Sequence, residues 1–246
     1  MNKISASAQL GENITVGDFT VIKDDVELGD NIIIGNNVVI HAGTKLGDNI
    51  RIDDNTVIGK QPMKAVTSAV SDDERQPPCE IDDGCLIGAN TVIYAGCEIG
   101  NNCLIADQAS VRENVTVGEK TIIGRGTAIE NYCEVGSKCK LETNVYITAY
   151  SEIEDNCFIA PGVTTSNDNF AGRSEERYDK FKGVTVKEGG RIGAGAIILP
   201  GIIIKEDGFA AAGSVVTKDI ANKKIVAGIP AKEFGDVPED QLLENQ

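Results

Sequence analysis

Cysteine and histidine are the residues whose spacing most directly tests this chain for metal or thiol chemistry. The 246 residues include seven cysteines and one histidine, His41. The sequence has no Cys-x-x-Cys pair and no cluster of cysteine with histidine, which argues against a zinc site. We therefore expect no metal centre, and we interpret His41 as an outward-facing surface residue.

The cysteine spacing instead reveals a structural repeat. The cysteines stand at positions 79, 85, 97, 103, 133, 139 and 157, so every gap between them is a multiple of six. The same period places an aliphatic residue at the first position of each unit, in runs from Ile4 to Ile58, Ile81 to Ile159 and Val186 to Ala210. All seven cysteines fall at the fifth position, where the other residues are mostly small.

One large and one small inward residue every six positions are typical of a parallel β-helix. Each unit supplies a short strand and a turn, and three units close one coil of 18 residues. The repeat has about 30 units, which predicts about ten coils. The cysteines are then small buried side chains in stacked columns rather than nucleophiles.

Net charge and the distribution of apolar residues argue against two classes of partner. The net charge of −15 would repel a phosphate backbone, so we expect no nucleic-acid partner. No apolar run approaches the ~18 residues of a membrane span, so we expect no membrane partner. The N-terminal segment has no apolar core of a secretory signal, and we expect a cytoplasmic protein.

Two insertions interrupt the repeat, at residues 60–78 and 167–183. Turn residues that lie 18 positions apart stack on the same corner of successive coils. The corner of the first insertion continues through Ala95, Glu113, Asn131 and Ala149 to Asn167, where the second insertion departs. Both loops should therefore leave one corner, four coils apart. Long loops on a repeat scaffold usually carry function, so Glu113 and Asn131 become candidate catalytic residues.

The repeat resembles that of the hexapeptide-repeat acyltransferases over about nine-tenths of the chain. The resemblance implies an all-β, left-handed parallel β-helix over residues 1–220 and a C-terminal tail, 221–246, with a short helix. It also implies a homotrimer. In IADQAS, Asp107 stands where acyltransferases with a catalytic histidine have I-A-H, so Asp107 is a third catalytic candidate. The γ-class carbonic anhydrases share the repeat but need three histidines, which excludes them here.

The C-terminal segment from AGAIILPG to GIPAKEF resembles the last coils of acetyl-CoA-dependent family members. There the pantetheine arm lies along backbone exposed at small residues, and basic residues suit the CoA phosphates. Acetyl-CoA is therefore the expected co-substrate. The matching positions are Pro200, Gly201, Ala212, Gly213, Ser214, Lys218, Lys223 and Pro230.

The segments TSNDNFAGRSEER and KGVTVKEGGRIGAGA, with the first insertion, resemble dTDP-3-amino-3,6-dideoxyhexose N-acetyltransferases. The resemblance implies an enzyme in which the amine of a nucleotide-linked amino sugar attacks the thioester directly in a ternary complex. Tyr94, which could stack on a base or sugar, and Asn167 and Asp168 are the expected substrate contacts. Two alternatives stay open: an O-acetyltransferase acting on a sugar or serine hydroxyl, and a non-catalytic sugar-nucleotide-binding β-helix protein.

Overall fold

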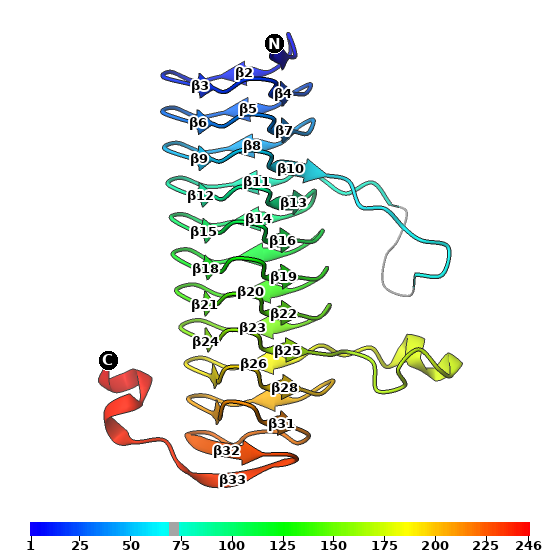
Figure 1. The fold of residues 1–246 in the computed structure, drawn as a ribbon, viewed down its shortest axis with the longest axis vertical. Coiled ribbons are helices and arrows are strands. Elements are labelled where there is room, and N and C mark those ends of the chain that lie inside the picture. Colours follow the sequence, from blue (N-terminus) through cyan, green and yellow to red (C-terminus); the bar gives the residue numbers. More distant parts are fainter. Residues whose placement is uncertain (69–73) are drawn as a thin grey trace.

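The computed structural model describes residues 1–68 and 74–246, which wind into a long triangular prism (Figure 1). Three sheets form its faces, and from β1 to β31 each strand pairs in parallel with strands three places away in the chain, β30 also pairing with β32. This pairing arises because three units close one coil and bring the fourth strand beside the first. The fold is the all-β parallel β-helix that the repeat predicts, with the left hand that the family resemblance implies.

Most strands have two residues, the first pointing outward and the second into the core. Sheet 1 consists of β1 (Lys3–Ile4), β4 (Val21–Ile22), β7 (Val39–Ile40), β10 (Val57–Lys60), β13 (Val92–Tyr94), β16 (Ser110–Val111), β19 (Ala128–Ile129), β22 (Tyr146–Ile147), β25 (Thr164–Thr165), β28 (Ile197–Ile198) and β31 (Val215–Val216). Sheet 2 consists of β2 (Gln9–Leu10), β5 (Glu27–Leu28), β8 (Lys45–Leu46), β11 (Glu80–Ile81), β14 (Glu98–Ile99), β17 (Thr116–Val117), β20 (Glu134–Val135), β23 (Glu152–Ile153), β26 (Thr185–Val186) and β29 (Ile203–Ile204). Sheet 3 consists of β3 (Thr15–Val16), β6 (Ile33–Ile34), β9 (Arg51–Ile52), β12 (Leu86–Ile87), β15 (Leu104–Ile105), β18 (Ile122–Ile123), β21 (Lys140–Leu141), β24 (Phe158–Ile159), β27 (Arg191–Ile192), β30 (Phe209–Ala210), β32 (Lys224–Gly228) and β33 (Ala231–Asp236).

The C-terminal end differs in detail from the prediction. The sheets have eleven, ten and twelve strands, so the predicted count of about ten coils is slightly low. The last coil was missed because the six-residue pattern fades after Ala210, yet β31, a single bridge at Ile220 and β32 still continue the pairing. The predicted boundary at residue 220 thus falls inside this coil. In place of one short helix, the tail forms the antiparallel hairpin β32–β33 and two single-turn helices, η2 (Glu239–Gln241) and η3 (Leu243–Asn245).

In the described part of the chain, helix is otherwise confined to η1 (Glu175–Asp179), a short 3-10 helix in the second insertion. Among residues 1–68 and 74–246, no helix has the length and apolar character that crossing a membrane requires.

The fifth position of each unit explains the cysteines. A hydroxyl or thiol there donates to the carbonyl 15 residues further on, as Thr121 Oγ1 does to Gly136 (2.7 Å) and Cys103 Sγ to Gly118 (3.1 Å). All seven cysteines are free and buried. Burial raises the pKa of Cys97 and of Cys133 to about 12, which keeps both as neutral thiols. The structure therefore supports the interpretation of the cysteines as small buried side chains rather than nucleophiles.

The two insertions leave the prism at one corner, as predicted. The first follows β10 and the second follows β25, and β13, β16, β19 and β22 lie between them in sheet 1. Figure 1 shows both loops projecting from the same edge. We call the column of turns that follows the sheet 1 strands the insertion corner.

The core predicts which substitutions the prism tolerates. Ile123→Ala removes a fully buried side chain between stacked coils, and we expect it to lower the free energy of unfolding by about 2–5 kcal/mol. Cys103→Thr is the matched control, because a threonine at the same position, Thr121, makes the equivalent hydrogen bond. Thermal unfolding of both variants would measure the difference. Equal losses would contradict this account of the fifth position.

Candidate functional site

A ladder of polar side chains runs along the insertion corner, one from each coil: Lys60, Tyr94, Arg112, Glu130 and Thr148. The Lys60 ammonium donates to the Tyr94 hydroxyl (3.2 Å) and lies 4.7 Å from the ring centroid. The Arg112 guanidinium, from the coil on the other side, lies 5.0 Å from the same centroid. Both cations thus cover the Tyr94 ring. The stacking on a base or sugar expected of Tyr94 would require one of them to move.

Glu113 is bound on both carboxylate oxygens by its neighbour. Arg112 donates from Nε to Oε2 at 2.8 Å and from Nη2 to Oε1 at 2.9 Å. The Glu113 side chain is only 3% exposed. A buried carboxylate is stabilised by such a bidentate partner. Glu113 therefore anchors Arg112, and its oxygens are turned away from an incoming substrate.

Glu130, which the sequence analysis overlooked, is the more accessible carboxylate on this corner. Its Oε2 accepts from Arg112 Nη1 at 3.4 Å, and its side chain is 25% exposed. Burial raises the pKa of Glu130, the Glu113 charge raises it further, and Arg112 opposes both. Burial and the nearby Glu130 charge also raise the pKa of Tyr146. The sequence did hold a signal for Glu130, because it stands directly before the candidate Asn131 in the same turn.

Asn131 is fully buried next to Glu130, and two tyrosines follow on the same corner. The Tyr132 and Tyr150 rings are parallel, with centroids 5.5 Å apart. Both residues have left-handed backbone, with φ of 58° and 64°, where Asn114 occupies the equivalent turn. The same left-handed backbone recurs at turns along the prism, as at Phe19 (φ 59°) and Lys138 (φ 58°), so it is a feature of the coil. The pair forms an aromatic wall beside Glu130.

The insertions fold back at either end of this group. In the first, Asn114 Nδ2 donates to Gln76 Oε1 at 2.9 Å and Gly96 N to the Pro77 carbonyl at 2.7 Å. These contacts fix that loop next to Glu113 and Arg112.

In the second insertion, Asp168 accepts from the amides of Phe170 (2.8 Å) and Gly172 (2.9 Å) and pairs with Arg177 at 3.4 Å. The Gly172 amide is the main cause that lowers the pKa of Asp168. Its neighbour Asn167 accepts on its carbonyl from Lys182 N at 3.2 Å. Both predicted substrate contacts therefore help to hold the loop in shape.

Asp107 lies on a different corner, which follows sheet 3. Its carboxylate accepts from the Ala89 amide of the preceding coil at 2.8 Å. Asp48 accepts in the same way from Asp30, and Asp155 from Ser137, in turns without insertions. The contact of Asp107 is thus a repeated feature of the coil. Within one chain, the structure does not bring Asp107 together with Glu113 and Asn131.

The residues expected to bind acetyl-CoA divide among three corners. Pro200, Gly201 and Lys218 lie on the insertion corner; Ala212, Gly213, Ser214 and Pro230 lie on the corner that follows sheet 3. A groove of about 370 Å³ at the C-terminal end is lined by Lys218, Pro230 and Lys232, among others.

Lys223 lies on the third corner and is separate from this groove. Its ammonium pairs with Glu244 at 2.8 Å. The groove thus unites Lys218 and Pro230 but not Lys223.

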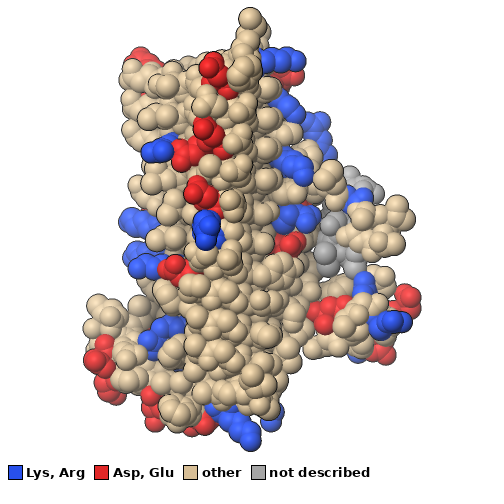
Figure 2. Space-filling view, viewed as in Figure 1, with Lys and Arg blue, Asp and Glu red and all other residues tan. Residues whose placement is uncertain are grey.

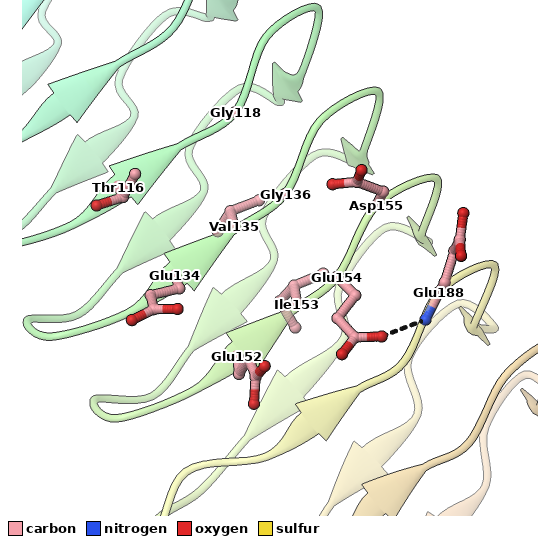
Figure 3. A pocket seen from close by; sticks show the side chains of 10 residues that line it. All are labelled: Thr116, Gly118, Glu134, Val135, Gly136, Glu152, Ile153, Glu154, Asp155 and Glu188. Carbon is pink, nitrogen blue, oxygen red and sulfur yellow. Dashed lines mark hydrogen bonds between the residues drawn. The ribbon is translucent and has the colours of Figure 1, made fainter.

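A second groove, of about 520 Å³, lies on sheet 2 and has the opposite character. Figure 3 shows Glu134, Glu152, Glu154, Asp155 and Glu188 around it. Four of them are engaged. Glu154 accepts from the Glu188 amide at 2.9 Å and from Lys187 at 2.6 Å, and Lys187 also pairs with Glu152 at 3.7 Å. Asp155 accepts from the Ser137 amide at 2.7 Å and Glu188 from Asn156 Nδ2 at 3.2 Å. Such a surface repels phosphate groups. It is a poor place for either expected ligand.

Two family models match the chain. The model described as bacterial transferase hexapeptide (six repeats) matches residues 7–42, 78–113 and 96–131, and the hexapeptide repeat of succinyl-transferase matches residues 29–60. No curated protein is similar enough to count as a match.

Among solved structures, an Arabidopsis UDP-N-acetylglucosamine acyltransferase is 19% identical, with a TM-score of 0.65 over 96% of this chain and 73% of that one. A UDP-N-acetylglucosamine acyltransferase from Bacteroides fragilis is 23% identical over the same shares, with a TM-score of 0.48. A maltose O-acetyltransferase from Clostridium difficile is 26% identical, with a TM-score of 0.45 over 50% of this chain and 70% of that one. The Arabidopsis structure supports the fold, and the two family models show that residues 7–60 and 78–131 carry hexapeptide repeats of the kind found in bacterial transferases.

Proposed function

We propose that this protein is an acetyl-CoA-dependent N-acetyltransferase that acts on the amino group of a nucleotide-linked amino-deoxysugar, with dTDP as the expected nucleotide. The observation that carries the proposal is the insertion corner itself. It combines an accessible carboxylate, Glu130, with a buried amide, Asn131, and an aromatic wall, all between two loops. The matches to hexapeptide-repeat transferase models support group transfer, and the resemblance of the insertions supports the amino sugar.

Between the two insertions, the described residues of this corner include no histidine, which favours an amine over a hydroxyl as acceptor. A hydroxyl is a weak nucleophile and needs a strong general base, most often histidine. A neutral amine attacks a thioester unaided and needs only an acceptor for the proton that it then loses. Glu130 meets that requirement, because its side chain is partly exposed and its pKa is raised.

The proposed reaction is one direct transfer. The amine nitrogen forms a bond to the thioester carbonyl carbon, the carbon–sulfur bond breaks, and the electron pair leaves with the CoA thiolate. The proton passes from nitrogen to the Glu130 carboxylate and from there to the thiolate. Asn131 is proposed to orient the amine and the developing oxyanion. Glu113 is then a positioning residue that acts through Arg112.

The acyl donor is proposed to approach along the same corner from the C-terminal side. Lys218 lies four coils beyond Asn131 on this corner, a separation of about 19 Å at the usual strand spacing. An extended pantetheine arm would pass Gly201, and the CoA phosphates would lie near Lys218 and Lys232 in the C-terminal groove. The deoxysugar would pack its apolar face on the wall of Tyr132 and Tyr150.

A homotrimer is proposed from the outward-facing residues of the three sheets. Sheet 2 carries mainly charges there, at Glu27, Lys45, Glu80, Glu98, Glu134 and Glu152. Sheet 3 carries Ile33, Leu86, Leu104, Ile122, Phe158 and Phe209, and sheet 1 is rich in valine. Two apolar faces on one triangular prism suit a closed ring of three chains, in which sheet 1 of each chain packs against sheet 3 of the next.

The substrate panel is the primary test of the proposed function. The purified protein would receive acetyl-CoA with dTDP- and UDP-linked amino sugars and their hydroxyl counterparts, and CoA thiol would be followed with a chromogenic disulfide. We expect thiol release with an amino sugar and none with its hydroxyl counterpart. Release with hydroxyl acceptors alone would favour O-acetyl transfer, and no release with any acceptor would favour a binding protein.

Glu130 is tested by the pH dependence of kcat/KM. Glu130→Gln should lower turnover about 100-fold or more and remove the loss of activity that protonation of Glu130 causes at low pH. Because Glu113 raises the pKa of Glu130, Glu113→Gln should move that loss to lower pH. Glu134→Gln, on the exposed face of sheet 2, is the matched control. A fully active Glu130→Gln enzyme would refute the assignment.

The assembly is tested by light scattering during size-exclusion chromatography. We expect a mass three times the 26.0 kDa of one chain. The double variant Leu86→Glu with Leu104→Glu places charge on the apolar face and should yield smaller species, whereas Glu98→Lys on sheet 2 should not. A monomeric wild-type protein would contradict the proposal.

A further inference from the structure

Three basic side chains occupy successive coils of the insertion corner just before the first insertion. Lys23 follows β4, His41 follows β7 and Lys60 ends β10. The Lys23 ammonium donates to His41 Nδ1 at 3.0 Å. Lys60 reaches the other way, to the Tyr94 hydroxyl. Figure 2 shows Lys and Arg side chains along this edge on the N-terminal side of the first insertion.

None of these three side chains forms an ion pair among residues 1–68 and 74–246. Burial is the first cause that lowers the pKa of His41, and Lys23 and Lys60 add to it; no carboxylate acts on the imidazole. The nearest acid in sequence, Asp24, accepts a hydrogen bond from Ser5 Oγ at 2.5 Å. Such a group is unusual in a chain of net charge −15. An anion bound here would relieve the repulsion between like charges.

We propose that Lys23, His41 and Lys60 form a binding site for phosphate oxygens, which takes the diphosphate of the nucleotide-linked acceptor. The choice of this ligand rests on the function proposed above, whereas the anion site rests on the three side chains themselves. Lysine and protonated imidazole are both strong donors to phosphate. Because His41 is the middle residue, it would contact the anion together with a lysine on either side.

The spacing along the corner fits this ligand. Lys23 and Lys60 lie two coils apart, which is about 10 Å at the usual strand spacing. The Lys60 ammonium reaches Tyr94, whose coil is two coils, again about 10 Å, from that of Glu130. A diphosphate held at Lys60 would thus leave room for one sugar ring between the phosphates and the Glu130 carboxylate.

His41 is the chain's single histidine, so its imidazole proton resonance reports on the site directly by NMR. Titration of that resonance with pH would be compared without ligand and with dTDP, inorganic phosphate or CoA. We expect dTDP to raise the pKa of His41, because a nearby anion stabilises the imidazolium. The same change with phosphate at equal concentration would assign the site to free phosphate and overturn the diphosphate assignment. A change with CoA but not with dTDP would assign the site to the acyl donor and would also overturn the diphosphate assignment.

Calorimetry of dTDP binding supplies a second, independent measurement. Lys23→Ala and Lys60→Ala should each weaken binding about tenfold, and Lys138→Ala, on another corner, should not. Since binding raises the pKa of His41, affinity for dTDP should increase as pH falls through that pKa, and His41→Gln should lose this dependence.

The outcomes separate this site from the proposed function. If dTDP leaves the His41 resonance unchanged while a dTDP-amino sugar is acetylated, the phosphate site is refuted and the function stands. If dTDP raises the pKa of His41 but no amino sugar is acetylated, the site stands and the proposed function fails.

Discussion

The structure depends on one constraint, the stacking of successive coils at the spacing of paired β-strands. Each strand bonds to its equivalents one coil away, so a residue is always next to the residue 18 positions earlier and later, except across the insertions. Side-chain columns follow automatically. In the core they give stacked isoleucines and hydroxyl or thiol groups that donate to the same carbonyl position. On the outside, the same stacking turns a sequence into a linear arrangement of charges.

That linear arrangement is most informative on the insertion corner. From the N-terminal end, the basic side chains of Lys23, His41 and Lys60 come first. The ion pair of Arg112 and Glu113 follows. The partly exposed Glu130 and the aromatic wall come next, and Lys218 stands near the C-terminal end. In the proposed mechanism, two anionic ligands approach from opposite ends and meet at Glu130. The acidic groove on sheet 2 would repel both anionic ligands.

Period and phase were enough to predict most of the fold. The 18-residue arithmetic carried Ala95 to Asn167 correctly across four coils, because each hydrogen-bonded rung enforces the register. The last coil escaped prediction because the six-residue pattern fades after Ala210, and its five-residue strand β32 pairs with β30 on one side and with the hairpin partner β33 on the other. The hand of the helix came from the family resemblance, since a pattern of inward residues is the same for either hand.

The site was less predictable because it depends on side-chain directions within a turn. The periodicity identified Glu113 and Asn131, but not that Arg112 would bind both oxygens of its own neighbour. That geometry exists only where the chain bends, so that consecutive side chains can converge. It also decides that Glu130, rather than Glu113, faces outward. Asp107 stays a prediction, because a carboxylate that repeats as a turn contact looks, in sequence, the same as one that performs chemistry.

Because both insertions leave a single corner, the number of coils between them sets the distance between the two loops. Each coil between β10 and β25 is a self-contained unit of three strands, so a gain or loss of one whole coil would leave every face in register. It would change the separation of the two loops by about 4.8 Å. A relative with one coil more between its loops would accommodate a longer acceptor, such as one with an additional sugar ring, without any change in the chemistry at the reacting carboxylate. Coil number, rather than side-chain identity, would then set the length of molecule that such an enzyme accepts.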